Sequence, residues 1–220
     1  MIKKIKEFLK AHYPKPEYSI ALLFAITITL LLMPFSIENT RQANLISKWN
    51  MKINRIEYMF SVMTTQATDD MLKSLKNAQT TKDKEQILLM IVKPYLRVNT
   101  VKKPSRNYKP KFLNGSVIPK DNMFYFEDFY FGENNNIVGI KNIHTETLKD
   151  PLFIMMFDLN GILLPNKWGK DIFGVYVYDE GVIKPFGYEK ALIDLKNDCS
   201  VKGTGIGCSY YYTIGGDFDE

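Results

Sequence analysis

The chain has 220 residues and a mass of 25.5 kDa, enough for one domain with an appendage and too little for a multi-domain assembly. Hydrophobic residues make up 45% of the chain and charged residues 24%, a composition that excludes an intrinsically disordered protein. The net charge of +5 comes mainly from a lysine-rich N-terminus. The sequence therefore does not predict a nucleic-acid-binding protein, whose basic residues would gather on one face of the folded part.

Residues 1–17 form a basic leader before the most apolar stretch of the chain. From Tyr18 to Phe35 no residue is charged, and as a helix this stretch would span about 27 Å, close to the roughly 30 Å hydrocarbon core of a bilayer. A buried core helix and a cleaved signal peptide are the alternatives, but a signal peptide has a shorter apolar core and a small-x-small cleavage pattern. We therefore expect a transmembrane helix at 18–35. Because the lysines precede it, the leader should stay in the cytoplasm and the rest of the chain should cross the membrane.

Residues 36–98 have helical periodicity in two stretches, predicting a stalk and further helices. Along the first, apolar residues recur at steps of three and four, which predicts an amphipathic helix that packs on a globular head or on neighbouring subunits: Leu45, Trp49, Ile53, Ile56, Phe60 and Met63. The second is expected from about 69 to 96, with a break at Thr80-Thr81, and its regular pattern ends at Lys93-Pro94. Residues 99–116, basic and proline-containing, are interpreted as an exposed linker.

The C-terminal half, 117–220, has the pattern of an antiparallel sheet. Short β-favouring segments alternate with Gly, Asn, Asp and Pro, which are typical of turns. No helix alternates with these segments, so the fold class is expected to be α+β, with helices first and the sheet head after them. The five segments cover 123–131, 136–143, 151–159, 171–178 and 181–187.

The only two cysteines, Cys199 and Cys208, flank a short glycine-containing loop near the C-terminus. In an oxidising compartment such a pair predicts one disulfide, which would stabilise the chain by roughly 2–3 kcal/mol. Two free thiols in a cytosolic loop are the alternative. A disulfide agrees with the predicted export of this half of the chain.

Together these features resemble a type IV pilin or a type II secretion pseudopilin. Glu17 begins the apolar run and Pro34 follows seventeen residues later, the separation between the early-helix glutamate and the kink proline in that family. The leader has a degenerate cleavage site, with His12 and Tyr13 where the family has glycine and phenylalanine. The C-terminal half is similar to many bacterial pilin-like proteins in the segments Asp158-Leu-Asn160-Gly161, Pro165-Asn166-Lys-Trp-Gly169-Lys170-Asp171-Ile-Phe173, Pro185-Phe-Gly187 and Gly205-Ile-Gly207-Cys208.

The resemblance implies a structural subunit in the bacterial inner membrane, with its head in the periplasm or outside the cell. Its partners would be other pilin-like subunits, the inner-membrane assembly platform and the lipid bilayer. Glu17 would pair with the freed N-terminal amine of a neighbouring subunit, or lie among lipid headgroups if the leader is kept. The competing interpretation is a stand-alone anchored sensor or ligand-binding domain, whose pocket would be lined by aromatic residues that otherwise form sheet core: Phe124, Tyr125, Phe126, Phe129, Tyr130 and Phe131.

No enzyme is predicted, because the two histidines, His12 and His144, are far apart and no acid–base pair can be nominated. No cofactor is predicted either. The segment from Asp158 to Asp171 makes calcium possible, since Asp158, Asn160 and Asp171 supply oxygen ligands and the family resemblance includes pseudopilins that bind calcium in a C-terminal loop. The segment lacks the acidic density of a recognised calcium loop, and turn formation explains the same residues.

Overall fold

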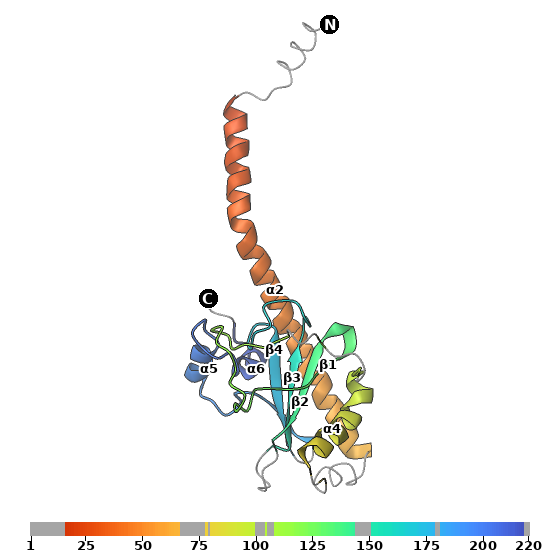
Figure 1. The fold of residues 1–220 in the computed structure, drawn as a ribbon. Coiled ribbons are helices and arrows are strands. Elements are labelled where there is room, and N and C mark those ends of the chain that lie inside the picture. The colour runs from red at the N-terminus through yellow and green to blue at the C-terminus, as the bar shows by residue number, and fades with distance from the viewer. Residues whose placement is uncertain are drawn as a thin grey trace, which may run out of the picture. The chain divides into compact units, whose positions relative to one another are not determined.

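The computed structural model describes residues 16–66, 78, 80–99, 104, 108–143, 151–178 and 181–217. The chain divides into two compact units, Met1–Ala43 and Asn44–Glu220. Helix α2 (Pro16–Gln66) contributes residues to both units. The second unit therefore contains both the predicted stalk helices from Asn44 onward and the predicted sheet head (Figure 1).

The second unit contains one five-stranded sheet, in which every neighbouring pair is antiparallel and the strands follow chain order. The expected α+β class and the antiparallel sheet are confirmed. Each strand falls inside one of the five predicted segments. The strands are β1 (Phe129–Phe131), β2 (Ile137–Asn142), β3 (Phe153–Asp158), β4 (Ile172–Val177) and β5 (Ile183–Pro185).

Both faces of this sheet are covered, which explains why its central strand is apolar at nearly every position. Side chains alternate between the faces of a strand. In β3, Phe153, Met155 and Phe157 join the larger apolar cluster, while Ile154 and Met156 join the smaller one. All six residues of β3 are buried.

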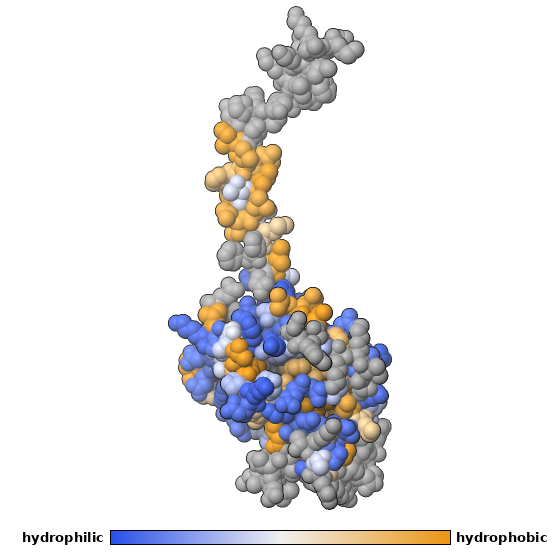
Figure 2. Space-filling view, in the orientation of Figure 1, coloured by the Kyte–Doolittle hydropathy of each residue, from blue (hydrophilic) through white to orange (hydrophobic). Residues whose placement is uncertain are grey.

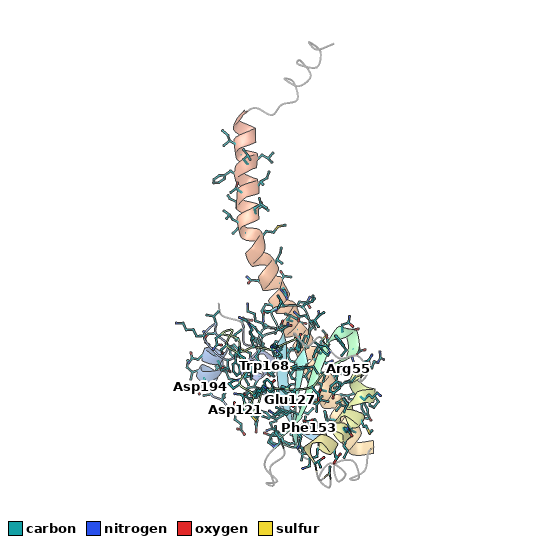
Figure 3. The ribbon with its side chains drawn as sticks, in the orientation of Figure 1. Arg55, Asp121, Glu127, Phe153, Trp168 and Asp194 are labelled. Atoms are coloured by element: carbon teal, nitrogen blue, oxygen red, sulfur yellow. A yellow bond between two sulfur atoms is a disulfide. The ribbon has the colours of Figure 1, made fainter. Side chains whose placement is uncertain are left out.

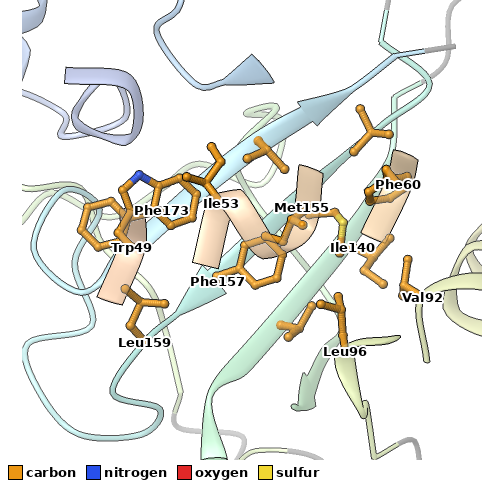
Figure 4. Close-up of a cluster of buried hydrophobic side chains, with 14 of the residues drawn as sticks. Trp49, Ile53, Phe60, Val92, Leu96, Ile140, Met155, Phe157, Leu159 and Phe173 are labelled. Atoms are coloured by element: carbon orange, nitrogen blue, oxygen red, sulfur yellow. The ribbon is translucent and has the colours of Figure 1, made fainter. Parts of the chain in front are cut away.

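Helix α2 covers the face that carries the larger cluster (Figure 4). The six periodic apolar residues from Leu45 to Met63 are between 0 and 7% exposed. Trp49 stacks on Phe173 with ring centroids 5.1 Å apart, and Phe60 lies 6.0 Å from Phe153. The predicted amphipathic stripe is confirmed, and its packing partner is the sheet of the same chain.

Helix α4 (Thr81–Leu96) completes this layer, and its start was predicted correctly. Thr80 is its N-cap, with Oγ1 accepting a hydrogen bond of 3.1 Å from the backbone of Asp83. The helix ends at Leu96, as predicted, but Pro94 lies inside it and does not stop it. The predicted part of this stretch at 69–77 lies outside the described residues. Leu96 is only 2% exposed, so its packing outweighs the hydrogen bond that proline removes in the last turn.

Coil covers the opposite face of the sheet, and the last part of the predicted linker 99–116 belongs to this coil, whereas 100–103 and 105–107 lie outside the described residues. From Tyr108 onward that segment is packed: Tyr108, Phe112 and Leu113 are all buried. Lys111 donates to Asn166 through its backbone and accepts from Trp168, both at 3.0 Å. No described helix covers this face, so the apolar residues of the coil do so instead.

The C-terminal part contains short helices that the sequence analysis did not predict. They are α5 (Leu192–Asp198), α6 (Cys208–Tyr211) and the 3-10 helix η3 (Tyr212–Ile214), while η1 (Glu133–Asn135) lies between β1 and β2. Cys199 and Cys208 are joined by the predicted disulfide, with their Cα atoms 5.3 Å apart. The disulfide ties the end of α5 to the start of α6.

In the first unit, the described side chains of α2 from Ile20 to Met33 are mostly apolar and exposed (Figure 2). Their large hydrophobic members are between 42% and 68% exposed. Among the described residues, no helix combines sufficient length and apolar character to cross a membrane. Glu17 and Pro34 lie within α2, but their side chains are outside the described part.

Candidate functional site

The connection between β3 and β4 brings two buried carboxyl groups together. Asp158 ends β3 and pairs in register with Ile172, the first residue of β4. Asp171 precedes Ile172, and its carbonyl oxygen accepts a hydrogen bond of 2.9 Å from Leu159. Asp158 and Asp171 are both 0% exposed. Two of the three calcium candidates from the sequence therefore meet in the interior of the head.

Hydrogen bonds hold both carboxyl groups in place. Tyr108 donates through its hydroxyl to Asp158 Oδ2 at 2.8 Å, and the backbone of Asn160 donates to Asp158 Oδ1 at 3.2 Å. Asp171 accepts from the backbones of Asn166 and Lys167 at 2.9 and 2.7 Å. We call Asp158, Asp171 and the four residues that donate to them the carboxylate corner.

Burial dominates the electrostatics of the carboxylate corner. It raises the pKa of Asp158 to about 8, and the nearby charge of Asp171 adds to the shift. Burial also raises the pKa of Asp171, although its hydrogen bonds oppose this, and raises the pKa of Tyr108. At neutral pH, Asp158 is therefore mostly protonated.

The carboxylate corner has the oxygen atoms that a hard divalent cation requires. The side-chain amide of Asn166 faces Gly161 O at 3.1 Å, Leu163 O at 2.8 Å and Asp158 Oδ2 at 3.2 Å. When Nδ2 faces these three oxygens, Asn166 donates to all of them. When Oδ1 faces them instead, the group contains four oxygens, counting Oδ1. The buried side-chain amide of Asn160 lies next to Asp171, and its hydrogen bond lowers the pKa of that carboxyl group.

These atoms suit Ca²⁺, which binds carboxylate, amide and carbonyl oxygens. Within the described ranges, no group of three or more His, Cys, Asp or Glu residues could hold a metal ion. The amides and carbonyls would therefore have to complete any calcium site around Asp158 and Asp171.

A pocket of about 650 Å³ lies on the coil-covered side of the head, and Tyr108 belongs to both its wall and the carboxylate corner. Four of the six aromatic residues predicted for a ligand pocket line it, whereas Tyr130 and Phe131 do not. Phe126 is also buried in the smaller core cluster. The lining residues are Pro104, Tyr108, Lys109, Pro110, Val117, Ile118, Lys120, Phe124, Tyr125, Phe126, Glu127, Asp128 and Phe129.

No site role was predicted for Tyr108, which lies in the predicted linker. Asn166 was predicted only as part of a segment similar to pilin-like proteins. The dipeptide Pro165-Asn166 could have indicated a tight turn at this site, because asparagine tolerates the left-handed backbone that it adopts here, with φ of 50°. His12 and His144 lie outside the described residues.

No protein-family model, curated protein or solved structure matches this chain.

Proposed function

We propose that this protein is a pilin-like or pseudopilin-like subunit of a type IV pilus or a type II secretion system, anchored in the membrane and assembled through α2. The proposal rests on a difference in the exposure of apolar side chains along that helix. Its described apolar side chains from Ile20 to Met33 are exposed, whereas the apolar stripe from Leu45 to Met63 is buried against the sheet. One part of the helix thus binds its own head, and the other is available to lipid and to neighbouring subunits.

The hydroxyl groups in the apolar part support insertion into lipid. Thr27 and Thr29 donate to the carbonyl oxygens of Leu23 and Ala25, each at 2.8 Å. A polar group without a partner is expensive in hydrocarbon, and these bonds remove that cost. The apolar residues around them then favour the bilayer.

The separation of Glu17 and Pro34 and the disulfide at the C-terminus also support this proposal through the family resemblance. In the proposed mechanism, α2 packs laterally against the same helix of other subunits, while the α+β head supplies the outer contacts. The partners are other pilin-like subunits, the inner-membrane assembly platform and the lipid bilayer. The head lies in the periplasm or outside the cell.

The proposal is tested by placing a photo-crosslinking amino acid at Phe24, which is 68% exposed, in the full chain expressed in bacteria. The matched control carries it at Leu192, which is 63% exposed on α5. We expect the chain to resist alkaline extraction from membranes and to form self-adducts of two or more subunits from position 24. An extractable chain without self-adducts would contradict both anchoring and assembly. Mass spectrometry of the extracted chain would report whether residues 1–12 are removed.

The pocket favours a second candidate function, a stand-alone anchored domain that binds a small ligand. Its volume lies within the range of about 300–1,000 Å³ typical of small-molecule sites. Membrane retention without self-adducts in the crosslinking experiment would favour this candidate over assembly.

A further inference from the structure

The pocket beside Tyr108 has walls that are fixed by contacts outside it. Phe124 packs on Phe186, with ring centroids 4.9 Å apart, and lies 6.0 Å from Trp168. The ring of Tyr108 meets Phe129 edge to face at 4.8 Å, and its hydroxyl is held by Asp158. A ligand would therefore find the aromatic walls already in position, which lowers the entropic cost of binding.

The segment that carries Phe124 and Tyr125 is fixed by a half-buried cation, Lys141. Lys141 donates through Nζ to the carbonyl oxygens of Asn122, Met123 and Tyr125 at 3.1, 3.1 and 3.0 Å. Asn122 also accepts a hydrogen bond of 2.8 Å from the backbone of Phe124 at its side-chain oxygen. This part of the wall is thus attached to β2, which lies within the sheet.

The pocket lining carries charges of both signs around its apolar residues. Lys109 and Lys120 supply positive charge, and Glu127 and Asp128 supply negative charge. Burial raises the pKa of Glu85, and the charges of Asp128 and Glu127 add to the shift. The charge of Lys141 opposes this shift. Glu127, labelled in Figure 3, lines the pocket and adds negative charge next to the aromatic rings, a combination that favours an ammonium group.

We propose that this pocket binds a small zwitterion with an apolar body, of the size of a dipeptide. The ammonium group would face Glu127 and the aromatic rings, the carboxylate would face Lys109 and Lys120, and the apolar side chains would lie on the aromatic and proline surface. This inference rests on the second candidate function and is independent of assembly through α2.

The test is calorimetric titration of the full chain in lipid nanodiscs with the dipeptide Leu-Phe, with empty nanodiscs subtracted. The capped form, acetylated at its N-terminus and amidated at its C-terminus, is titrated in parallel. We expect the free dipeptide to bind and the capped form to bind at least about fivefold more weakly. Capping removes charge pairs that together contribute about 1 kcal/mol, which corresponds to about fivefold in affinity. Equal binding of the two forms, or no heat with millimolar dipeptide, would overturn the proposal.

Variants locate the binding to the pocket. Glu127→Gln and Lys120→Gln should each weaken binding about threefold to fivefold. Asp194→Asn and Lys202→Gln remove similar exposed charges elsewhere and should leave it unchanged. Val117→Trp places a large ring at a position that is 74% exposed on the pocket lining, so it should block the site without disturbing the core. Unaltered binding to Val117→Trp would place the dipeptide elsewhere and overturn the assignment.

The outcome is separable from the proposed assembly function. Alkaline extraction and self-crosslinking at Phe24 report on α2, whereas the titration reports on the pocket. If anchoring fails while dipeptide binding and its variant pattern persist, the inference stands and the assembly proposal fails. If anchoring and self-crosslinking persist without dipeptide binding, only the inference fails.

Discussion

The indole Nε1 of Trp49 donates a hydrogen bond of 2.7 Å to the carbonyl oxygen of Ser209, a residue 160 positions later in the chain. Both residues are 0% exposed. Ser209 also accepts a hydrogen bond of 3.0 Å at its Oγ from the backbone of Gly174 in β4. This buried contact joins α2, β4 and α6, so the C-terminal segment is part of the core on which α2 packs.

Replacing Trp49 with Phe should therefore destabilise the head. The substitution leaves the Ser209 carbonyl oxygen without its donor and removes part of the ring that stacks on Phe173. We expect the free energy of unfolding to fall by about 2–3 kcal/mol, measured by denaturant titration of the full chain. Tyr58→Phe, at a position 72% exposed on the same helix, should change it by less than about 0.5 kcal/mol. Equal effects of the two variants would contradict the role of this contact.

Because Gly174 has no side chain, the ring of Phe186 can pack directly against its backbone. A Cβ atom at Gly174 would lie 2.3 Å from Phe186 Cε2 and 2.8 Å from the carbonyl oxygen of Met155. Gly174→Ala should lower the melting temperature through overpacking that costs about 1–3 kcal/mol. Gly132→Ala is the matched control, because its Cβ would first meet a methyl group of Val138 at 3.1 Å, and it should have the smaller effect. A melting temperature unchanged by Gly174→Ala would show that Phe186 can move.

The stability of the head should depend on pH through Asp158. Its pKa in the folded chain is about 8, whereas in the unfolded chain an aspartate has a pKa of about 4. The folded chain therefore binds more protons between these values, and the free energy of unfolding decreases as pH rises from about 4 to about 8. Asp158→Asn should flatten this dependence in denaturant titrations at several pH values.

The control for this pH dependence is Asp194→Asn, which changes an exposed carboxylate on α5. It should leave the slope of stability against pH unchanged. An equal slope in the Asp158→Asn variant would assign the pH dependence to other groups.

Calcium binding at the carboxylate corner can be tested directly by isothermal titration. A bound cation would displace the proton of Asp158 and stabilise the folded chain, by about 2.7 kcal/mol at a hundred times the dissociation constant. If the site is real, heat should be observed, with a rise in melting temperature, and both should be absent in Asp158→Asn. Absence of heat in the parent chain at millimolar calcium would assign Asp158, Asn160 and Asp171 to structure alone.

Asp198 should hold the C-terminal loop in shape together with the disulfide. Its carboxylate accepts hydrogen bonds from Thr204 N, Thr204 Oγ1 and Gly207 N at 2.9, 2.6 and 2.7 Å. Replacing Cys199 and Cys208 with Ser should cost roughly 2–3 kcal/mol, and Asp198→Asn in that background should cost more than in the parent chain. Equal costs in the two backgrounds, measured by denaturant titration, would show that the two restraints act independently.

Several elements could be predicted because their signals are local. The β3 segment is a short apolar run between turn residues, which is typical of a strand buried on both faces, and the structure places β3 inside it. The stripe from Leu45 to Met63 follows the helical period and is buried as such. The membrane span at 18–35 and the pilin-like assembly stay predictions.

Other features could not be predicted because no local pattern encodes them. Helix α5 is only 7 residues long, too short for a clear periodicity. Tyr108 lies among lysines and prolines, a composition typical of exposed coil, yet it is buried because its hydroxyl reaches Asp158. Pro94 does not end α4, because Leu96 in the same last turn is buried in the core.

Local patterns in the chain were enough to predict the order and type of the main elements, the apolar stripe of α2 and the pairing of Cys199 with Cys208. These depend on residues a few positions apart, or on the presence of only two cysteines. Contacts between distant segments were needed to show that the stripe packs on the sheet, that Tyr108 joins Asp158 and Asp171, and that aromatic residues and charges of both signs line a pocket. Such groupings depend on strand register and on where the chain reverses, and both are set by packing between segments far apart in the sequence.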